Sequence, residues 1–233
     1  MVSTVQWRGI SNLAIVKCDT HYRLPERRFD NAMLMNSIEY WAMNNPARVF
    51  VQRHYEAPRL KQLSTGDADN ILEIGCGQGA GARIIYDLFS PKQYFGVDLD
   101  PRMIRRARKK AGDLPNASFI EGDVANLDFP DASFDLVMDF GVIHHVPNWR
   151  EALAELYRVL ELHGEFLFED LPLETWERGV GIPFKRIADH PYDEMFRKQE
   201  FVDELVSLGF SVETHENSPF SFYHFWGRAE KIS

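Results

Sequence analysis

The segment with the clearest chemical potential runs from Glu73 to Gly81 and reads Glu-Ile-Gly-Cys-Gly-Gln-Gly-Ala-Gly. Glycines let a chain turn sharply and bring backbone N–H groups against a ligand. An apolar run precedes this loop and a helical pattern follows it, which is the context in which such a loop binds a ligand. The carboxylate of Glu73 suits a positively charged part of that ligand and is a poor neighbour for pyrophosphate. The loop therefore predicts a binding site for a ligand that carries positive charge.

Two later acids extend the predicted site. Asp98 ends the next apolar run, where a carboxylate accepts hydrogen bonds from two ribose hydroxyls. Asp123 and Val124 follow the third run, where a polar side chain meets an adenine amino group while the valine packs on the ring. A ribose, an adenine and a cationic group occur together in S-adenosylmethionine, which carries a sulfonium and an amino-acid tail and has no phosphate. This compound is the cofactor that the residues predict.

These motifs resemble the class I S-adenosylmethionine-dependent methyltransferases, and they are most similar to the small-molecule branch that includes the ubiquinone/menaquinone C-methyltransferases. The resemblance covers roughly residues 70–170, through segments 71–79, 95–99, 120–123, 134–147, 158–160 and 164–166. It implies that the methionine end of the cofactor lies along Glu73, Gly75, Cys76, Gly77 and Gly79. It also implies contacts of the ribose with Asp98, of the adenine with Leu99, Asp123 and Val124, and of the methyl side with Phe140.

His144 and His145 follow the fourth predicted strand, at the edge of the sheet where open α/β folds bind their ligands. Methyl transfer from a sulfonium is an in-line displacement, and it needs a base only when the attacking atom carries a proton. His144 is the candidate base, and Tyr192 and His190 are weaker candidates. One of the two adjacent histidines also fits a packing or helix-capping role. No metal site is predicted, because adjacent histidines point apart and no Cys or carboxylate cluster joins them.

The elements that must position these residues begin at Asn70, where short apolar runs start to alternate with amphipathic patterns. Such alternation predicts a parallel sheet with helices on both faces. Two last strands with no helix between them must pair antiparallel. The expected fold is a three-layer, Rossmann-like α/β domain with a seven-stranded, mostly parallel sheet and an antiparallel last strand. The predicted strands cover 71–74, 94–97, 118–120, 134–138, 164–168, 210–214 and 221–229, and the predicted helices cover 80–89, 149–160, 199–208 and a segment that begins at Pro101.

Two further parts are predicted around this domain. Residues 1–65 read as an N-terminal helical cap rich in Met and aromatic side chains, and residues 66–233 as the cofactor-binding methyltransferase domain. A Pro-rich and aromatic segment at about 171–197 interrupts the pattern before the sixth strand, and we interpret it as a lid. Because Met adapts to varied shapes, the cap and the lid together predict a small, partly apolar methyl acceptor enclosed from solvent.

The composition narrows the range of partners. The chain has 233 residues, with 26 Lys and Arg against 35 Asp and Glu, a formal net charge of -9. This balance argues against a nucleic-acid partner, so the basic stretch 102–110 reads as a solvated helix face. Cys18 and Cys76 cannot form a disulfide framework, which favours a reducing, cytoplasmic location. No run approaches the ~20 apolar residues of a membrane span. The oligomeric state stays open.

Two alternatives to a methyltransferase remain from the sequence. The spacing Gly75-x-Gly77-x-x-Ala80 satisfies a relaxed dinucleotide pattern and so allows an NAD-type oxidoreductase. Glu73, the histidine pair and the antiparallel final strands count against it. The second alternative is a non-catalytic adenosyl-binding scaffold, since a fold alone does not establish catalysis.

Overall fold

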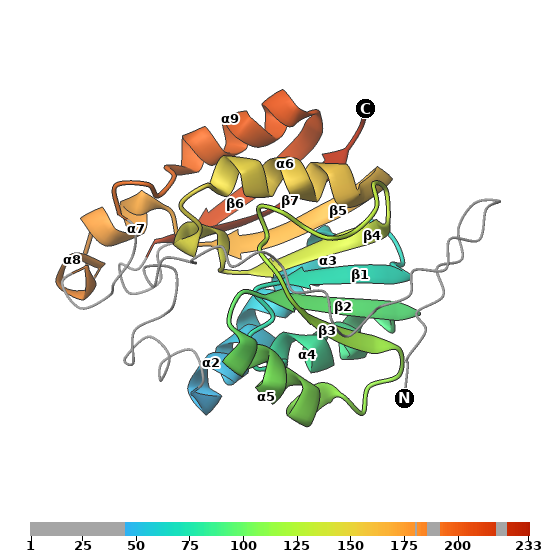
Figure 1. Ribbon diagram of the computed structural model, residues 1–233. Coiled ribbons are helices and arrows are strands. Elements are labelled where there is room, and N and C mark those ends of the chain that lie inside the picture. The colour runs from blue at the N-terminus through green and yellow to red at the C-terminus, as the bar shows by residue number, and fades with distance from the viewer. Residues whose placement is uncertain (1–44, 180, 186–191, 218–222) are drawn as a thin grey trace, which may run out of the picture. The chain divides into compact units, whose positions relative to one another are not determined.

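The computed structural model describes residues 45–179, 181–185, 192–217 and 223–233. Helices and strands alternate through them and build a seven-stranded sheet (Figure 1). The sheet order is β3-β2-β1-β4-β5-β7-β6. Its strands are β1 Asn70–Ile74, β2 Gln93–Asp98, β3 Ala117–Glu121, β4 Phe134–Phe140, β5 Leu160–Asp170, β6 Phe210–Asn217 and β7 His224–Lys231.

Strand directions confirm the predicted topology. Strands β1 to β5 run parallel, whereas β7 lies antiparallel between β5 and β6. The last strand, β7, thus lies between β5 and β6, and the short connection from β6 to β7 requires the two to pair antiparallel. An all-parallel dinucleotide-binding sheet in the order 3-2-1-4-5-6 has no such inserted strand. All carboxyl ends of β1 to β5 therefore meet at one edge of the sheet.

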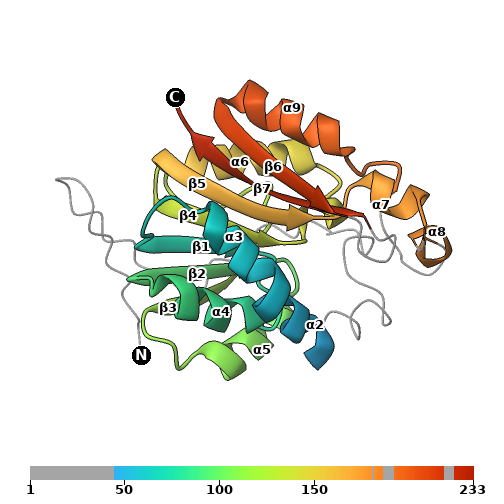
Figure 2. The ribbon, with the colours of Figure 1, turned by 180° about the vertical axis from the view of Figure 1, so that it is seen from behind.

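Helices cover both faces of the sheet, which gives the three predicted layers (Figures 1 and 2). One face packs against α3 (Ala57–Leu63), α4 (Ala80–Phe89) and α5 (Pro101–Ala111), and shares with them a buried cluster that includes Ile71, Tyr94, Phe119, Met138 and Phe140. The other face packs against α6 (Trp149–Val159) and α9 (Lys198–Leu208), with an aromatic group formed by Trp149, Phe168, Phe196, Phe201 and Phe225. Strands buried on both sides explain the continuous apolar runs in the sequence.

A helical segment of three parts precedes β1. It consists of α2 (Pro46–Val51), the π-helix η2 (Gln52–Glu56) and α3. The side chain of Asn45 caps the start of α2 by accepting a hydrogen bond from the Ala47 N–H at 2.9 Å. Residues 1–44 of the predicted cap, including its methionines, lie outside the described residues, as does Cys18. The division into a cap and a methyltransferase domain stays a prediction.

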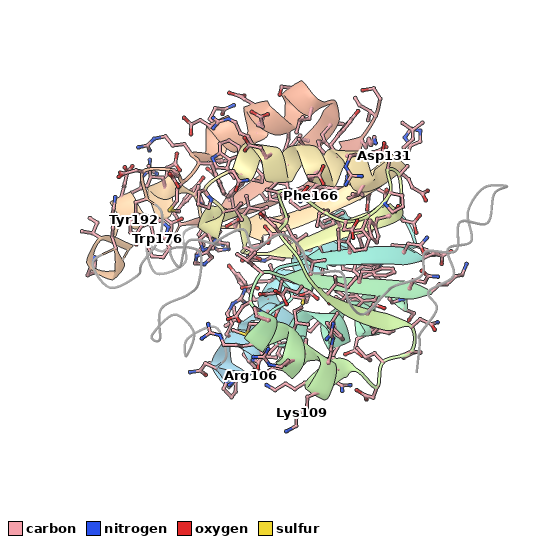
Figure 3. The ribbon with its side chains drawn as sticks, in the orientation of Figure 1. Arg106, Lys109, Asp131, Phe166, Trp176 and Tyr192 are labelled. Carbon is pink, nitrogen blue, oxygen red and sulfur yellow. The ribbon has the colours of Figure 1, made fainter. Side chains whose placement is uncertain are left out.

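The predicted lid contributes two short helices where it is described, α7 (Leu173–Glu177) and α8 (Gly181–Phe184). Trp176 and Tyr192 face each other there with ring centroids 5.9 Å apart (Figure 3). Tyr192 is therefore engaged in packing in this part of the chain, and His190 lies outside the described residues. Among the helices of the described ranges, none is long and apolar enough to cross a bilayer.

Candidate active site

The glycine loop lies directly after β1, as predicted. Gly75, Gly77 and Gly79 have φ values of 59°, 52° and 83°, a left-handed backbone that residues with a side chain rarely adopt. At Gly75 an added Cβ would lie 2.5 Å from Cγ2 of Val142. Residues other than glycine are therefore excluded by this contact as well as by the backbone conformation. The N–H of Gly79 donates to the carbonyl of Cys76 at 2.9 Å and closes the loop before α4.

A cleft opens beside this loop, at the carboxyl ends of β1, β2 and β4. Its walls include six of the predicted cofactor residues, namely Glu73, Gly75, Cys76, Gly77, Asp98 and Phe140. Gly79, Leu99, Asp123, Val124 and the candidate base His144 are not part of these walls. The cleft has a free volume of about 100 Å³, which is below the roughly 300 Å³ at which small-molecule pockets usually begin. A nucleoside ligand would therefore require the side chains that line it to move.

Glu73 is buried at the floor of the cleft. Its carboxyl accepts a hydrogen bond from the Tyr94 hydroxyl, and Gly81 leaves it room, since a Cβ there would lie 2.0 Å from Glu73 Oε1. Burial raises the pKa of Glu73 to about 8, against the lowering effect of the Tyr94 hydrogen bond. The carboxyl is thus largely protonated at neutral pH, and a cation placed beside it would favour the charged form.

Asp98 ties the second strand to the glycine loop. Its Oδ2 accepts from the Gly77 N–H at 2.9 Å and its Oδ1 accepts from the Asp100 N–H at 2.8 Å. Burial raises the pKa of Asp98, while these two backbone hydrogen bonds lower it. Each carboxylate oxygen keeps a further lone pair for a hydroxyl donor. This geometry holds the carboxylate where a vicinal diol can reach it from the cleft.

Asp123 and Val124 follow the third strand, which was predicted at 118–120 and ends at Glu121. Asp123 forms an isolated bridge with Asn126, and its Oδ1 accepts from the Ala125 N–H at 2.9 Å. This side-chain hydrogen bond stabilises the turn that follows β3.

The sequence reasoning missed Arg48 and Gln52, which line the cleft from α2 and η2. Arg48 Nη1 lies 2.7 and 2.6 Å from the two carboxylate oxygens of Glu56, and Nη2 donates to the Phe140 carbonyl at 3.1 Å. Arg48 thereby connects the helix to the end of β4 across 92 positions of sequence. No local motif marks this residue. Only the unusual π-helical turn, a feature often found at functional sites, singles out the segment in the structure.

The two histidines occupy a short 3-10 turn, Ile143–His145, after β4. His145 lines the cleft, whereas His144 is 4% exposed and its Nδ1 contacts Asp170 Oδ1. Asp170 and Asp139 are both fully buried, and burial together with the charge of Asp170 raises the pKa of Asp139 well above its usual range. Asp139 Oδ2 and Asp170 Oδ2 find no hydrogen-bond donor. One proton shared by the two carboxyls would satisfy both oxygens.

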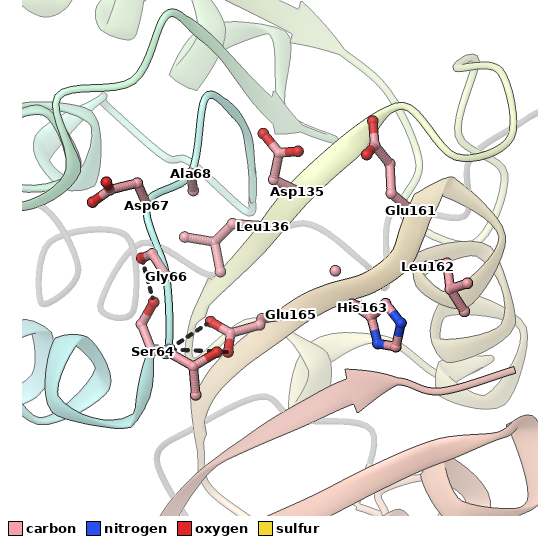
Figure 4. Close-up of a pocket in the computed structure, with 12 residues that line it drawn as sticks. Ser64, Gly66, Asp67, Ala68, Asp135, Leu136, Glu161, Leu162, His163 and Glu165 are labelled. Atoms are coloured by element: carbon pink, nitrogen blue, oxygen red, sulfur yellow. Dashed lines mark hydrogen bonds between the residues drawn. The ribbon is translucent and has the colours of Figure 1, made fainter.

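A second cavity, of about 180 Å³, lies at the opposite edge of the sheet, where β1, β4 and β5 begin (Figure 4). The Thr65 hydroxyl donates there to Glu165 at 2.7 Å, and Asp67, Asp135 and Glu161 make the walls acidic. Ligands of open α/β sheets bind at the carboxyl edge, so this cavity is not the candidate site. The described residues contain no group of three His, Cys, Asp or Glu that could hold a metal ion.

The charges of the cleft decide which nucleotide it fits. Glu73 and Asp98 are acidic, and the guanidinium of Arg48 is already paired with Glu56. A pyrophosphate beside the loop would face the Glu73 carboxyl without a cation of its own. A nucleoside with a positive charge and a free diol could place the charge beside Glu73 and the diol beside Asp98. The residues present therefore fit S-adenosylmethionine better than a dinucleotide.

Strand order, glycine loop and cleft together define a Rossmann-like α/β domain with a candidate ligand site at its carboxyl edge. Residues 72–168 match the model of a family described as a methyltransferase domain. A phthiotriol/phenolphthiotriol dimycocerosates methyltransferase of Mycobacterium tuberculosis is 34% identical over 172 residues, which cover 72% of this chain and 60% of that protein. A fatty-acid O-methyltransferase of Mycolicibacterium smegmatis is 34% identical over 118 residues, covering 49% of this chain and 43% of the relative.

Solved structures share the fold. A SAM-dependent methyltransferase from Aquifex aeolicus superposes with a TM-score of 0.66 at 18% identity, over 84% of this chain and 99% of that one. The N-methyltransferase NodS from Bradyrhizobium japonicum, in complex with S-adenosyl-L-homocysteine, superposes with a TM-score of 0.62 at 20% identity. The superposition covers 83% of this chain and 92% of that one. Residues 72–168 therefore match a methyltransferase domain, and the chain shares its fold with solved methyltransferases. The finer similarity to the ubiquinone/menaquinone branch stays a prediction.

Proposed function

We propose that the chain transfers the methyl group of S-adenosylmethionine to a small, partly apolar acceptor. The observation that carries this proposal is a pair of acids in a glycine-lined cleft, the buried Glu73 and the half-buried Asp98, within residues that match a methyltransferase domain. When bound, the cofactor supplies an electrophilic methyl group on a sulfonium. The chain spans 60% of the length of its mycobacterial relative, so the activity is proposed for this chain and not transferred from that protein.

In this proposal the cofactor lies along the glycine loop. Its methionine end contacts Glu73, Gly75, Cys76, Gly77 and Gly79, its ribose Asp98, its adenine Leu99, Asp123 and Val124, and its methyl side Phe140. The lining of the cleft supports the first, second and last of these placements. The protein would orient the reacting atoms and exclude water, which are the two contributions that an in-line displacement needs.

The acceptor is proposed to be lipid-like or otherwise partly apolar. The names of the two mycobacterial relatives refer to dimycocerosates and to a fatty acid, and a fatty acid carries a long apolar chain. Exposed apolar side chains on the helix at the mouth of the cleft, Phe50 at 64% and Val51 at 43%, are consistent with such a ligand. The predictions of a cytoplasmic location and of no nucleic-acid partner are untested.

A base at His144 remains part of the proposal. Its Nδ1 is held by Asp170, which would fix the tautomer that leaves Nε2 as the basic nitrogen. His145, the histidine that lines the cleft, is the matched comparison. Single-turnover rates of His144→Gln and His145→Gln, with the affinity for S-adenosylhomocysteine measured in both, decide which residue matters. A rate that falls only in His145→Gln would reassign the base.

The direct test uses S-adenosylmethionine labelled in its methyl group. Incubation with a panel of alkyl acids, alkyl alcohols, phenols and quinols should release S-adenosylhomocysteine with at least one class and move the label to it. S-adenosylhomocysteine should bind in calorimetry, and NAD should not. Tight binding without turnover on any acceptor would favour the adenosyl-binding scaffold, and binding of NAD alone would favour the oxidoreductase.

A further inference from the structure

A row of polar and aromatic side chains continues from the cleft across the sheet, on the face covered by α3. Phe140 of β4 is the register partner of Glu169 on β5, and Glu169 is the register partner of Trp226 on β7. Directly paired residues point to the same face of a sheet, about 5 Å apart. Glu169 therefore stands beside the wall of the cleft, next to the position proposed for the transferable methyl group.

Arg59 of α3 lies over this row. Its guanidinium carbon is 3.4 Å from the ring centroid of Tyr55 and 4.6 Å from that of Trp226. Its Nη1 atom is buried and has no hydrogen-bond partner, and Arg59 forms no ion pair with any residue in the described ranges. Stacking on two rings holds the group in place but leaves its in-plane donor unused. An arginine in this state is ready to receive an oxygen acceptor.

Glu169 presents the complementary group. Its side chain is 10% exposed, its Oε1 atom lies 3.8 Å from Nε2 of the buried His224, and its Oε2 atom is buried with no hydrogen-bond partner. Burial and the neighbouring charge of Glu56 raise the pKa of Glu169 to about 9, although Arg48 and Arg59 lower it. The carboxyl is thus protonated at neutral pH and carries an O–H donor. Two buried donors left without partners are costly, at about 1–3 kcal/mol each.

The charges favour one class of occupant. Arg48 is neutralised by Glu56, so the protonated Glu169 leaves the Arg59 cation without a counter-ion. A carboxylate would accept hydrogen bonds from both Arg59 Nη1 and the Glu169 O–H, and it would also neutralise the guanidinium. An amine would be repelled by Arg59, and an alcohol would leave the cation unpaired. Tyr55 and Trp226 supply apolar walls beside these polar atoms.

We propose that Arg59 and Glu169 form a subsite that binds a carboxylate of the methyl acceptor. The subsite deepens the proposed function and rests on it, because its place beside Phe140 gives it meaning only if the cleft holds the methyl donor. It assigns a binding and specificity role to residues outside the glycine loop, contributed by α3 and β5.

Binding of decanoate and of decan-1-ol to the full chain, saturated with S-adenosylhomocysteine, tests the subsite by calorimetry at pH 7. Arg59→Met keeps the apolar stem and removes the charge. It should weaken decanoate binding by about tenfold or more, as expected for a lost charge-assisted hydrogen bond, and change decanol binding by less than about threefold. Arg53→Met is the matched control, since Arg53 lies on the adjacent turn and pairs with the exposed Asp87. It should leave both affinities unchanged.

Two variants of Glu169 complete the experiment. Glu169→Gln keeps an uncharged donor and should retain decanoate binding within about threefold, whereas Glu169→Ala should lose about tenfold. Undetectable decanoate binding to the unmodified chain, or an equal loss of decanoate and decanol in Arg59→Met, would overturn the subsite and leave water as the occupant. S-adenosylhomocysteine affinity separates the two proposals. If it is normal, only the subsite fails, and if the unmodified chain does not bind it, the proposed function fails.

Discussion

At the scale of single residues, the protonation of Glu73 couples ligand binding to pH. The free protein holds a proton on this carboxyl up to its pKa of about 8, and a bound cation would lower that pKa, so binding releases the proton. Affinity for S-adenosylmethionine should therefore rise with pH, by at most about tenfold per unit, and become constant above about pH 8. Calorimetry from pH 6 to 9 measures this slope. Glu73→Gln should remove it, and the slope that remains in this variant reports the amino group of the ligand itself.

Asp98 is expected to govern affinity without governing the fold. Asp98→Ala removes the proposed ribose acceptor and should weaken S-adenosylhomocysteine binding by about tenfold to a hundredfold, the range for charge-assisted hydrogen bonds. Of the two N–H groups that lose their acceptor, that of Gly77 belongs to a half-buried residue that lines the cleft, so the thermal midpoint should fall little. The exposed Asp128→Ala is the charge-matched control. Unchanged affinity in Asp98→Ala would remove the residue from the cofactor site.

At the scale of elements, the contact between the glycine loop and the turn after β4 sets the shape of the cleft. Gly75→Ala introduces a methyl group 2.5 Å from Val142 Cγ2 at a left-handed φ of 59°. The loop and the turn must separate, so S-adenosylhomocysteine affinity should drop at least about tenfold with roughly 1–2 kcal/mol of lost stability. Gly66→Ala is the control, because its Cβ would meet nothing within 4 Å. If both variants bind equally well, the loop is not a ligand contact.

Elements with a clear local signal were predictable, and contacts between distant elements were not. The helix predicted at 80–89 has those bounds, because apolar spacing and flanking turn residues both mark it, and α9 ends before Gly209 as predicted. Strand β5 begins at Leu160, whereas the sequence predicted a start at Gly164. The strand therefore passes through this glycine. That glycine fits there since an added Cβ would lie 2.9 Å from the Glu161 carbonyl.

The candidate site divides in the same way. Glu73 and Asp98 lie at the carboxyl ends of β1 and β2, and Gly75 follows β1, so chain order alone puts them at one edge of the sheet. The choice between His144 and His145 depends on which way each side chain leaves a 3-10 turn, and no sequence pattern encodes that direction. Arg48, Arg59 and Glu169 come together only through the packing of α2 and α3 on the finished sheet. Long-range packing of this kind has no local signature.

At the scale of the whole molecule, the net charge of -9 is distributed unevenly. Helix α5 exposes six basic side chains, and two of them, Arg106 and Lys109, point away from the sheet (Figure 3). This matches the interpretation of residues 102–110 as a solvated face. The acidic groups include a buried set, in which Glu73, Asp139 and Glu169 all have raised pKa values. Protons held by that set make the stability of the fold depend on pH.

The dependence on pH has a definite sign. The folded pKa of Glu169, about 9, lies above the usual value of 4.5, so unfolding releases a proton at any pH between them. The stability that the protonated Glu169 contributes is present in full below about pH 4.5. It is lost as pH rises toward about 9, and the free energy of unfolding falls by at most about 1.4 kcal/mol per pH unit. Urea unfolding at pH 6 and pH 8 should therefore show a smaller decrease in Glu169→Gln than in the unmodified chain, by roughly 2 kcal/mol. Parallel decreases in the two proteins would mean that Glu169 is already ionised in the folded state, which would also remove the O–H donor assigned to it beside Arg59.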